Sequence, residues 1–114
     1  MIALNKNQFG GVQPHSIANL STTIYQIVIG SNQISRIIPP GIGNLVNVIG
    51  IGMEKNSLSG TIPHSVSEVK SLQLLSLGGN ELQGSIPSSL GNLTLLTQLG
   101  LYSNNSQGSI PSSL

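Results

Sequence analysis

Two histidines are the residues whose type and setting could support chemistry in this chain. His15 and His64 each follow a proline, in Pro14-His15-Ser16 and Pro63-His64-Ser65, and imidazole groups bind metal ions or act as general bases. Only three acidic residues are available among 114 to complete a metal site. Cysteine is absent, which excludes disulfides, thiolate metal sites and a cysteine nucleophile.

Motifs for other chemistries are incomplete. The serines of the Pro-Ser-Ser segments have no acid or base partner to activate them. Gly50-x-Gly52 lacks the third glycine of a dinucleotide-binding loop. The chain has no kinase signature, neither a glycine-rich loop with its lysine nor His-Arg-Asp or Asp-Phe-Gly. We therefore predict that this chain is not an enzyme and holds no cofactor and no metal.

One asparagine recurs at a nearly constant interval and indicates the elements that must position all other residues. The intervals between successive copies are 25, 24, 24 and 24 residues. We call these copies the marker asparagines: Asn7, Asn32, Asn56, Asn80 and Asn104. A fixed period in the twenties indicates a solenoid of stacked coils. We expect the marker side chains to be structural, because a carboxamide can both donate to and accept from backbone groups that a turn leaves unpaired.

Aliphatic residues stand eight, five and three positions before the markers, as Leu72, Leu75 and Leu77 do before Asn80. The last two alternate with other residues, which predicts a short strand with one buried face. A glycine four positions after most markers indicates a positive φ, with Arg36 as the exception. Aliphatics ten and thirteen positions after the markers predict a short 3₁₀ turn on the opposite side. Strands stacked roughly 4.8 Å apart would form a parallel sheet.

Neither metal ions nor nucleic acids are expected as partners. The two histidines occupy equivalent positions two coils apart, about 10 Å at the strand spacing, which is too far to share one ion. The net charge is +1, and the four basic residues are spread along the chain rather than clustered, so there is no electrostatic footprint for nucleic acid. The longest charge-free stretch contains prolines and asparagines, and we expect no direct membrane contact.

The repeat resembles the plant-type leucine-rich repeat, whose pattern is L-x-x-L-x-L-x-x-N-x-L-x-G-x-I-P-x-x-L-G-x-L. Residues 72–90 read L-Q-L-L-S-L-G-G-N-E-L-Q-G-S-I-P-S-S-L, and residues 84–94 are especially similar to the immune-type receptor kinases of plants. The resemblance implies an α/β solenoid, a right-handed leucine-rich-repeat coil. Its parallel β-sheet would line the concave face, and short 3₁₀ or irregular turns would line the convex face.

The phase of the markers divides residues 1–114 into one leucine-rich-repeat array. We expect a partial coil over 1–23, full coils over 24–47, 48–71 and 72–95, and a partial coil over 96–114. The terminal caps that solenoids need, which carry cysteines in this family, are missing, so we expect a fragment of a longer ectodomain. Isolated, such a fragment would expose apolar end faces and be marginally stable or associate.

Residues between the buried aliphatics are expected to face outward on the concave side. Polar side chains with a few tyrosines suit an extended peptide or a protein ligand, although a merely solvated face remains the alternative for any single residue. Tyr25 and Tyr102 are the strongest individual candidates, and Glu54 with Lys55 is most simply a surface charge pair. The candidate binding residues are Tyr25, Gln26, Glu54, Lys55, Gln73, Gln98 and Tyr102.

Two asparagines lie twelve residues after a marker in acceptor sequences for N-glycosylation, Asn19 in Asn-Leu-Ser and Asn92 in Asn-Leu-Thr. Their shared phase places both on the outer side of the coil. Asn104 also fits the short motif, but its marker role predicts a buried side chain. Asn19 and Asn92 are therefore the glycosylation candidates.

The resemblance implies a protein-interaction module from the ectodomain of a plant receptor-like kinase or receptor-like protein. Such a module would recognise a peptide or protein ligand, with a co-receptor as a further partner, in signalling or defence. It would lie on the extracellular face of the plasma membrane as part of a longer parent, whose kinase domain is absent here. Two alternatives stay open at this point: a soluble wall protein resembling polygalacturonase inhibitors, and a truncated, non-functional gene product.

Overall fold

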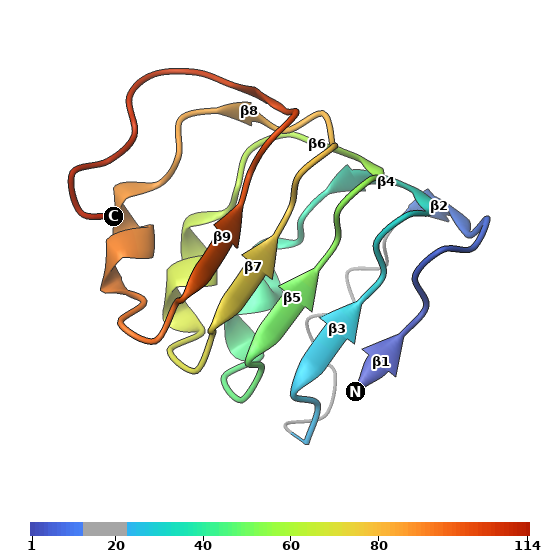
Figure 1. Ribbon diagram of the computed structural model, residues 1–114, viewed down its shortest axis with the longest axis horizontal. Helices are drawn as coiled ribbons and strands as arrows, with labels where there is room; N and C mark the ends of the chain where they lie inside the picture. The colour runs from blue at the N-terminus through green and yellow to red at the C-terminus, as the bar shows by residue number, and fades with distance from the viewer. Residues whose placement is uncertain (13–22) are drawn as a thin grey trace.

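The computed structural model describes residues 1–12 and 23–114, which wind as a series of stacked coils (Figure 1). His15 and the glycosylation candidate Asn19 lie outside the described residues. Each coil runs from a strand of one sheet, through the marker asparagine, to a turn on the far side and back. The period seen in the sequence is therefore the length of one turn of the chain.

A five-stranded parallel sheet forms one face of the molecule (Figure 1). Its strands, in spatial order, are β1 (Ile2–Ala3), β3 (Gln26–Val28), β5 (Gly50–Gly52), β7 (Leu74–Ser76) and β9 (Gln98–Gly100). The register pairs Ile27 with Ile51, Ile51 with Leu75, and Leu75 with Leu99. Each of these residues stands five positions before its marker, so the aliphatics of successive coils form one column. The predicted parallel sheet is confirmed.

Short helices cover the opposite side of the core. They are the 3₁₀ helices η2 (Pro40–Asn44), η3 (His64–Glu68) and η4 (Ser88–Asn92). Each begins after a proline that is in extended conformation at its N-cap. Proline suits a helix start because its ring fixes φ near the helical value and because it lacks the N–H that a helix start leaves unpaired. The predicted 3₁₀ turns on the side away from the sheet are confirmed.

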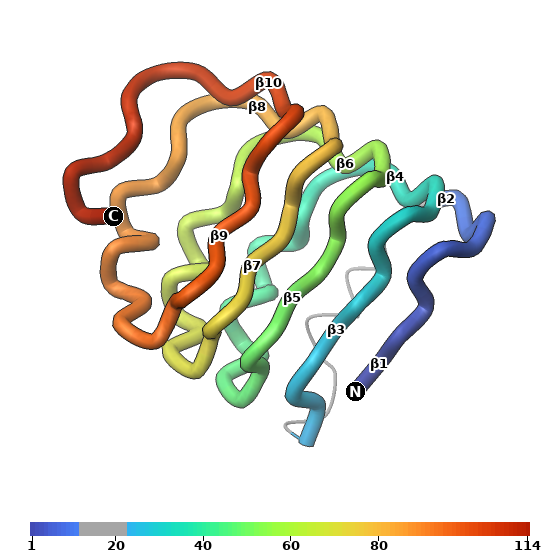
Figure 2. The backbone as a smooth tube through the Cα atoms, viewed as in Figure 1, coloured from blue at the N-terminus to red at the C-terminus, as the bar shows by residue number. Residues whose placement is uncertain are grey.

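Further strands follow the markers, and the sequence pattern did not predict them. One set is β2 (Gly10–Val12), β4 (Gln33–Ile37) and β6 (Ser57–Ser59), and the other is β8 (Gln83–Gly84) with β10 (Asn105–Ser106). Figure 2 shows them succeeding one another along the edge where each coil leaves the main sheet. These segments are only two to five residues long, too short for alternation to indicate a strand, although Leu58 of β6 is fully buried in the core.

The apolar core fills the space between the main sheet and the 3₁₀ helices as one continuous cluster. Ile27, Ile51 and Leu75 enter it from the strands, and Val66 and Leu90 enter it from the helices. Burying one such side chain contributes about 1.5–3 kcal/mol. Aliphatics of the outer coils pack on the cluster but are only partly buried: Ile24, Ile34, Ile86, Leu96, Leu99 and Leu101. Each coil thus depends on its neighbours for burial.

The marker asparagines hydrogen-bond successive coils together. Asn80 Oδ1 accepts from the backbone N–H of Leu58 at 3.0 Å, and Asn80 Nδ2 donates to the carbonyls of Met53 at 3.0 Å and Leu77 at 2.9 Å. Asn32, Asn56 and Asn104 make the equivalent bonds. Each carboxamide therefore bridges its own turn and the turn of the preceding coil.

Hydroxyl groups add further bonds between coils and account for much of the serine content. Ser71 Oγ donates to Val48 O at 2.8 Å, Ser113 Oγ donates to Ser88 O at 2.7 Å, and Ser65 Oγ donates to the carbonyl of Pro40. A neutral donor reaching the carbonyl of the preceding coil satisfies it without burying a charge. These serines therefore have structural partners.

Residues with positive φ recur at two places in every coil. Four residues after the markers, Gly60 has a φ of 74° and Gly84 a φ of 75°, as predicted, and Arg36 adopts 74° at the equivalent position. The residue directly before each marker is also left-handed: Lys6, Ser31, Lys55, Gly79 and Ser103. Only one of these is glycine, so their residue types do not indicate this second position.

Replacing Arg36 with glycine should raise the free energy of unfolding by about 1 kcal/mol, because a left-handed non-glycine residue costs roughly 1–2 kcal/mol and glycine loses part of that gain through unfolded-state entropy. Urea unfolding would measure the change. Gly11→Ala is the matched control: Gly11 has a φ of 88° and open space where a Cβ would lie, so alanine there should lower stability. A destabilised Arg36→Gly variant would contradict this prediction.

Candidate ligand-binding groove on the concave face

A groove crosses four neighbouring strands on the solvent side of the five-stranded sheet, which we call the concave face. Its volume is about 460 Å³. The strands β3, β5, β7 and β9 supply its lining together with the residues that flank them. The lining residues are Gln26, Val28, Ile49, Gly50, Gly52, Glu54, Gln73, Leu74, Ser76, Thr97 and Gln98.

Two glycines of β5 keep the groove open. A Cβ at Gly50 would lie 3.4 Å from Gln26 Cγ, and a Cβ at Gly52 would lie 3.7 Å from Val28 Cγ1. Side chains at these positions would therefore fill the space beside β3. Because neither glycine adds a side chain, the groove extends across β5, whose residues Gly50–Gly52 are themselves buried.

The Glu54 carboxylate folds back over glycines on both sides of it. A Cβ at Gly30 would lie 2.6 Å from Glu54 Oε1, and a Cβ at Gly52 would lie 3.3 Å from Glu54 Oε2. Glu54 can take this position only because neither glycine carries a side chain. Within the described part of the chain, Oε2 is buried and has no hydrogen-bond partner.

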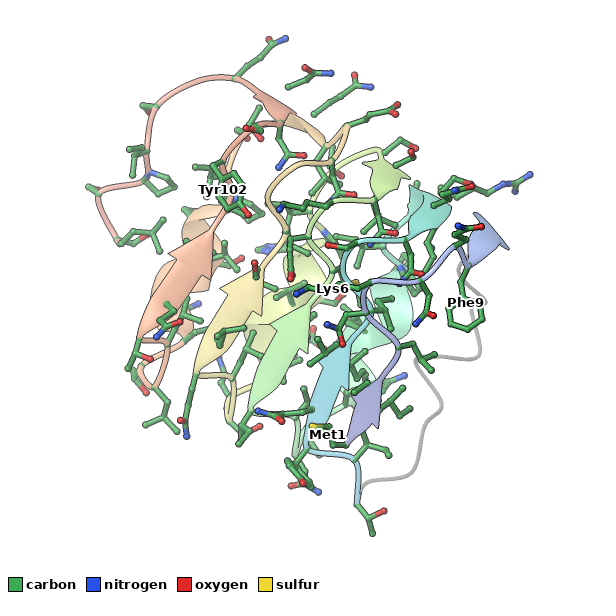
Figure 3. The ribbon with its side chains drawn as sticks, turned by 45° about the vertical axis from the view of Figure 1, so that its right-hand side comes forward. Met1, Lys6, Phe9 and Tyr102 are labelled. Carbon is green, nitrogen blue, oxygen red and sulfur yellow. The ribbon has the colours of Figure 1, made fainter. Side chains whose placement is uncertain are left out.

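Tyr102 uses a glycine in the same way one pair of coils later. A Cβ at Gly78 would lie 2.4 Å from Tyr102 Cε1, so the ring rests directly over that glycine. Tyr102 is 56% exposed and lies beyond the end of β9 (Figure 3). Phe9, 51% exposed, lies at the opposite end of the array beside β2 (Figure 3). Glycine and a large side chain thus alternate along one column of the concave face, which consists of Gly30, Glu54, Gly78 and Tyr102.

Four of the seven predicted binding residues line the groove, namely Gln26, Glu54, Gln73 and Gln98. The other three lie outside its lining. Tyr25 is exposed just before β3, and Lys55 lies against Gly79 of the following coil while Glu54 leans towards the preceding one. Glu54 and Lys55 therefore point away from each other.

The remaining lining residues were not among the predicted binding residues. The phase of the repeat does place them at outward positions of the same strands, so it identifies the face but not which of its residues line a groove. Gly50 and Gly52 shape the groove because they have no side chains. A glycine in a strand does not indicate which neighbouring side chain will lie over it. Leu74, Ser76 and Thr97 complete the wall across β7 and β9.

Other parts of the described chain offer no reactive centre. His64 Nδ1 lies 2.6 Å from Ser89 Oγ of the next coil, a contact between neighbouring turns. Residues 1–12 and 23–114 contain no group of three or more histidine and acidic side chains able to hold a metal ion. The same residues contain no helix with the length and hydropathy needed to cross a membrane.

The structure separates the two acceptor sequences for glycosylation that it describes. Asn92 is exposed at the end of η4, where an attached sugar would extend away from the coil. Asn104 Nδ2 donates to Leu77 O at 3.0 Å and Leu101 O at 3.2 Å, so its amide is already engaged. Asn92 stays a glycosylation candidate.

Comparison with known proteins gives a consistent set of similarities. The family model described as Leucine Rich Repeat matches residues 71–93. The Arabidopsis thaliana LRR receptor-like serine/threonine-protein kinase EFR is 50% identical over 48 residues, which are 42% of this chain and 5% of that protein.

Two solved structures extend the similarity over nearly the whole chain. The Arabidopsis receptor kinase HAESA ectodomain, in complex with an N-terminally extended IDA peptide hormone, is 36% identical with a TM-score of 0.93, covering 96% of this chain and 19% of that one. The BIR3–SERK2 complex from Arabidopsis thaliana is 34% identical with a TM-score of 0.93, covering 98% and 60%. This chain spans less than two thirds of each relative.

Proposed function

Because the chain is a plant-type leucine-rich-repeat protein that resembles the ectodomains of plant receptor kinases, we propose that its concave face recognises a peptide or protein ligand. The groove across β3, β5, β7 and β9 is the observation that carries this proposal. It combines two strand positions without side chains, Gly50 and Gly52, with the amide side chains of its lining glutamines. Such a surface offers an extended peptide both close approach and hydrogen-bond partners.

The relatives support a role in signalling at the cell surface. HAESA was solved with a peptide hormone, and BIR3 was solved in complex with SERK2, so related arrays bind both peptides and other arrays. We place this module on the extracellular face of the plasma membrane, within a receptor that serves signalling or defence and engages a co-receptor. Asn92 would carry a glycan in that compartment.

Selection of the purified chain against a library of short random peptides should enrich ligands that occupy the groove. Ser76→Arg, which places a long side chain in the groove, should weaken their binding at least tenfold, about 1.4 kcal/mol. Gln83→Arg adds the same charge at an exposed position on β8 outside the groove and should leave affinity unchanged. Calorimetric titration would measure both variants.

Two outcomes would contradict the proposed function: selection that enriches no ligand, or ligands that bind Ser76→Arg as tightly as the unmodified chain. A Tyr25/Tyr102 double alanine variant tests the tyrosines with the same ligands. Both rings are exposed at the margins of the concave face, so their loss should weaken binding. Unchanged affinity would remove both tyrosines from the site.

A further inference from the structure

Glu54 carries the one buried side-chain polar atom that lacks a hydrogen-bond partner among the described residues. Its Oε2 atom is buried and accepts no hydrogen bond there. A buried polar group without a partner is costly, and a buried charge is more costly still. The Asn80 carboxamide of the next coil, by contrast, has partners for both its oxygen and its nitrogen. The unpaired oxygen therefore marks Glu54 as a position kept for something outside the chain.

The surroundings of Glu54 define what could pair with it. It is the only charged residue among the eleven that line the groove, so no described lining residue neutralises it. Because neither Gly30 nor Gly52 carries a side chain, the carboxylate lies directly against both. Rotation about the terminal bond of a glutamate is soft, and it would turn the buried oxygen towards the groove without moving the backbone.

A divalent metal ion does not fit this site. Calcium takes six to eight oxygen ligands, and no group of three or more histidine or acidic residues exists among residues 1–12 and 23–114. A single cationic side chain needs only one carboxylate, and charge-assisted hydrogen bonds to it are about twice as strong as neutral ones. The glutamine amides along the groove can bond the backbone of the peptide that carries the cation.

We infer that the groove binds a peptide through a basic side chain whose cation pairs with the Glu54 carboxylate. This inference rests on the proposed function and specifies its ligand. The cation would enter over Gly52, where β5 presents no side chain, and would meet both carboxylate oxygens. Arginine suits this geometry best, because its planar guanidinium donates two parallel hydrogen bonds to a carboxylate.

The probes are two blocked peptides, acetyl-Gly-Ser-Arg-Ser-Gly-amide and its citrulline counterpart, which has nearly the same shape without the charge. The arginine peptide should bind at least tenfold more tightly than the citrulline peptide. Glu54→Gln should remove that difference, whereas Glu81→Gln, at an exposed glutamate outside the groove, should preserve it. Binding is measured by calorimetric titration of each peptide into the unmodified chain and into the two variants, because Glu54→Gln itself removes the carboxyl group under test.

Several results would overturn the inference: no binding of the arginine peptide, equal binding of both peptides, or equal losses in Glu54→Gln and Glu81→Gln. The midpoint of thermal unfolding gives an independent check. Glu54→Gln removes a buried unpaired charge, so the midpoint should stay the same or rise. A lowered midpoint would show that Glu54 supports the fold and would overturn the inference as well.

The two proposals fail in different ways. If the concave face binds no peptide, the random selection yields no ligand whose binding is weakened by Ser76→Arg. If only the identity of the ligand is wrong, selection yields groove-dependent peptides without basic residues, and Glu54→Gln binds them normally. Enrichment of arginine at one position of the selected peptides, lost when Glu54→Gln is the target, would support both.

Discussion

Replacing Asn80 with alanine is expected to lower the free energy of unfolding by about 3–5 kcal/mol. The side chain is only 9% exposed. Its loss leaves the Leu58 N–H without its acceptor and removes one of the two asparagine donors from each of the Met53 and Leu77 carbonyls, at about 0.5–1.5 kcal/mol for each lost hydrogen bond. Each unsatisfied buried group costs about 1–3 kcal/mol. Because whole domains are stable by only about 5–15 kcal/mol, urea unfolding should show a large shift in midpoint.

Asn7→Ala is the matched control for Asn80→Ala. Asn7 holds the same repeat position in the first coil, but its Nδ2 donates only to Leu4 O and Asn5 O within its own turn, and all of these groups are exposed. Water can replace those bonds, so the loss should stay below about 1 kcal/mol. Equal losses in the two variants would show that the bonds between coils add nothing.

Replacing Leu75 with alanine should cost about 2–5 kcal/mol, the range for truncating a leucine in a packed core. Leu75 is 1% exposed on β7, with Ile51 and Leu99 beside it in the register of the sheet. The unfolding free energy from urea denaturation, with a check that the slope is unchanged, would measure this loss.

Leu99→Ala provides the comparison for Leu75→Ala. Leu99 occupies the equivalent position on β9, where it is only partly buried, so truncation removes less buried surface and leaves a site open to water. A loss clearly smaller than that of Leu75→Ala is expected. If both variants lose the same stability, the coils would not differ in burial as the structure indicates.

The main sheet and the core could be predicted because their signal repeats. Ile27, Ile51 and Leu75 stand at one offset from a marker, and any residue with that phase must meet its counterpart in the next coil. The left-handed turn four residues after the marker was also predictable from glycine, and Arg36 adopts it despite its side chain. At Arg36 the geometry of the coil, which the neighbouring coils repeat at Gly11 and Gly60, overrides the preference of a non-glycine residue for negative φ.

The parts that escaped prediction depend on neighbours rather than on phase. Nothing in the types of Lys55 or Ser103 indicates a left-handed backbone; the next residue imposes it by reaching into two coils at once. The sequence also does not indicate where two coils approach each other closely. At Gly43, for example, a Cβ would lie only 2.6 Å from Ser65 O.

The groove was predictable in part. The repeat placed Gln26 and Gln98 on the outward side of their strands, where the structure has them. It did not reveal that Glu54 leans towards Gly30 while Tyr25 and Tyr102 stand outside the lining, because the direction of a side chain depends on which adjacent position is empty. Packing across coils, rather than the pattern along one coil, decides which outward residues share a site.

The bonds of the marker asparagines bear on how such chains can change length over evolution. Asn56 reaches back to Ile34 and Ile29 with the same atoms that Asn80 uses on Leu58 and Met53. If residues 48–71 were lost, Asn80 would meet Ile34 and Ile29 and find the same groups in the same places. A gain or loss of one whole period therefore leaves every junction chemically alike, whereas a one-residue slip in the pairing of two strands would turn buried side chains outward. Recombination in units of one coil can thus add or remove recognition surface while the joints stay intact.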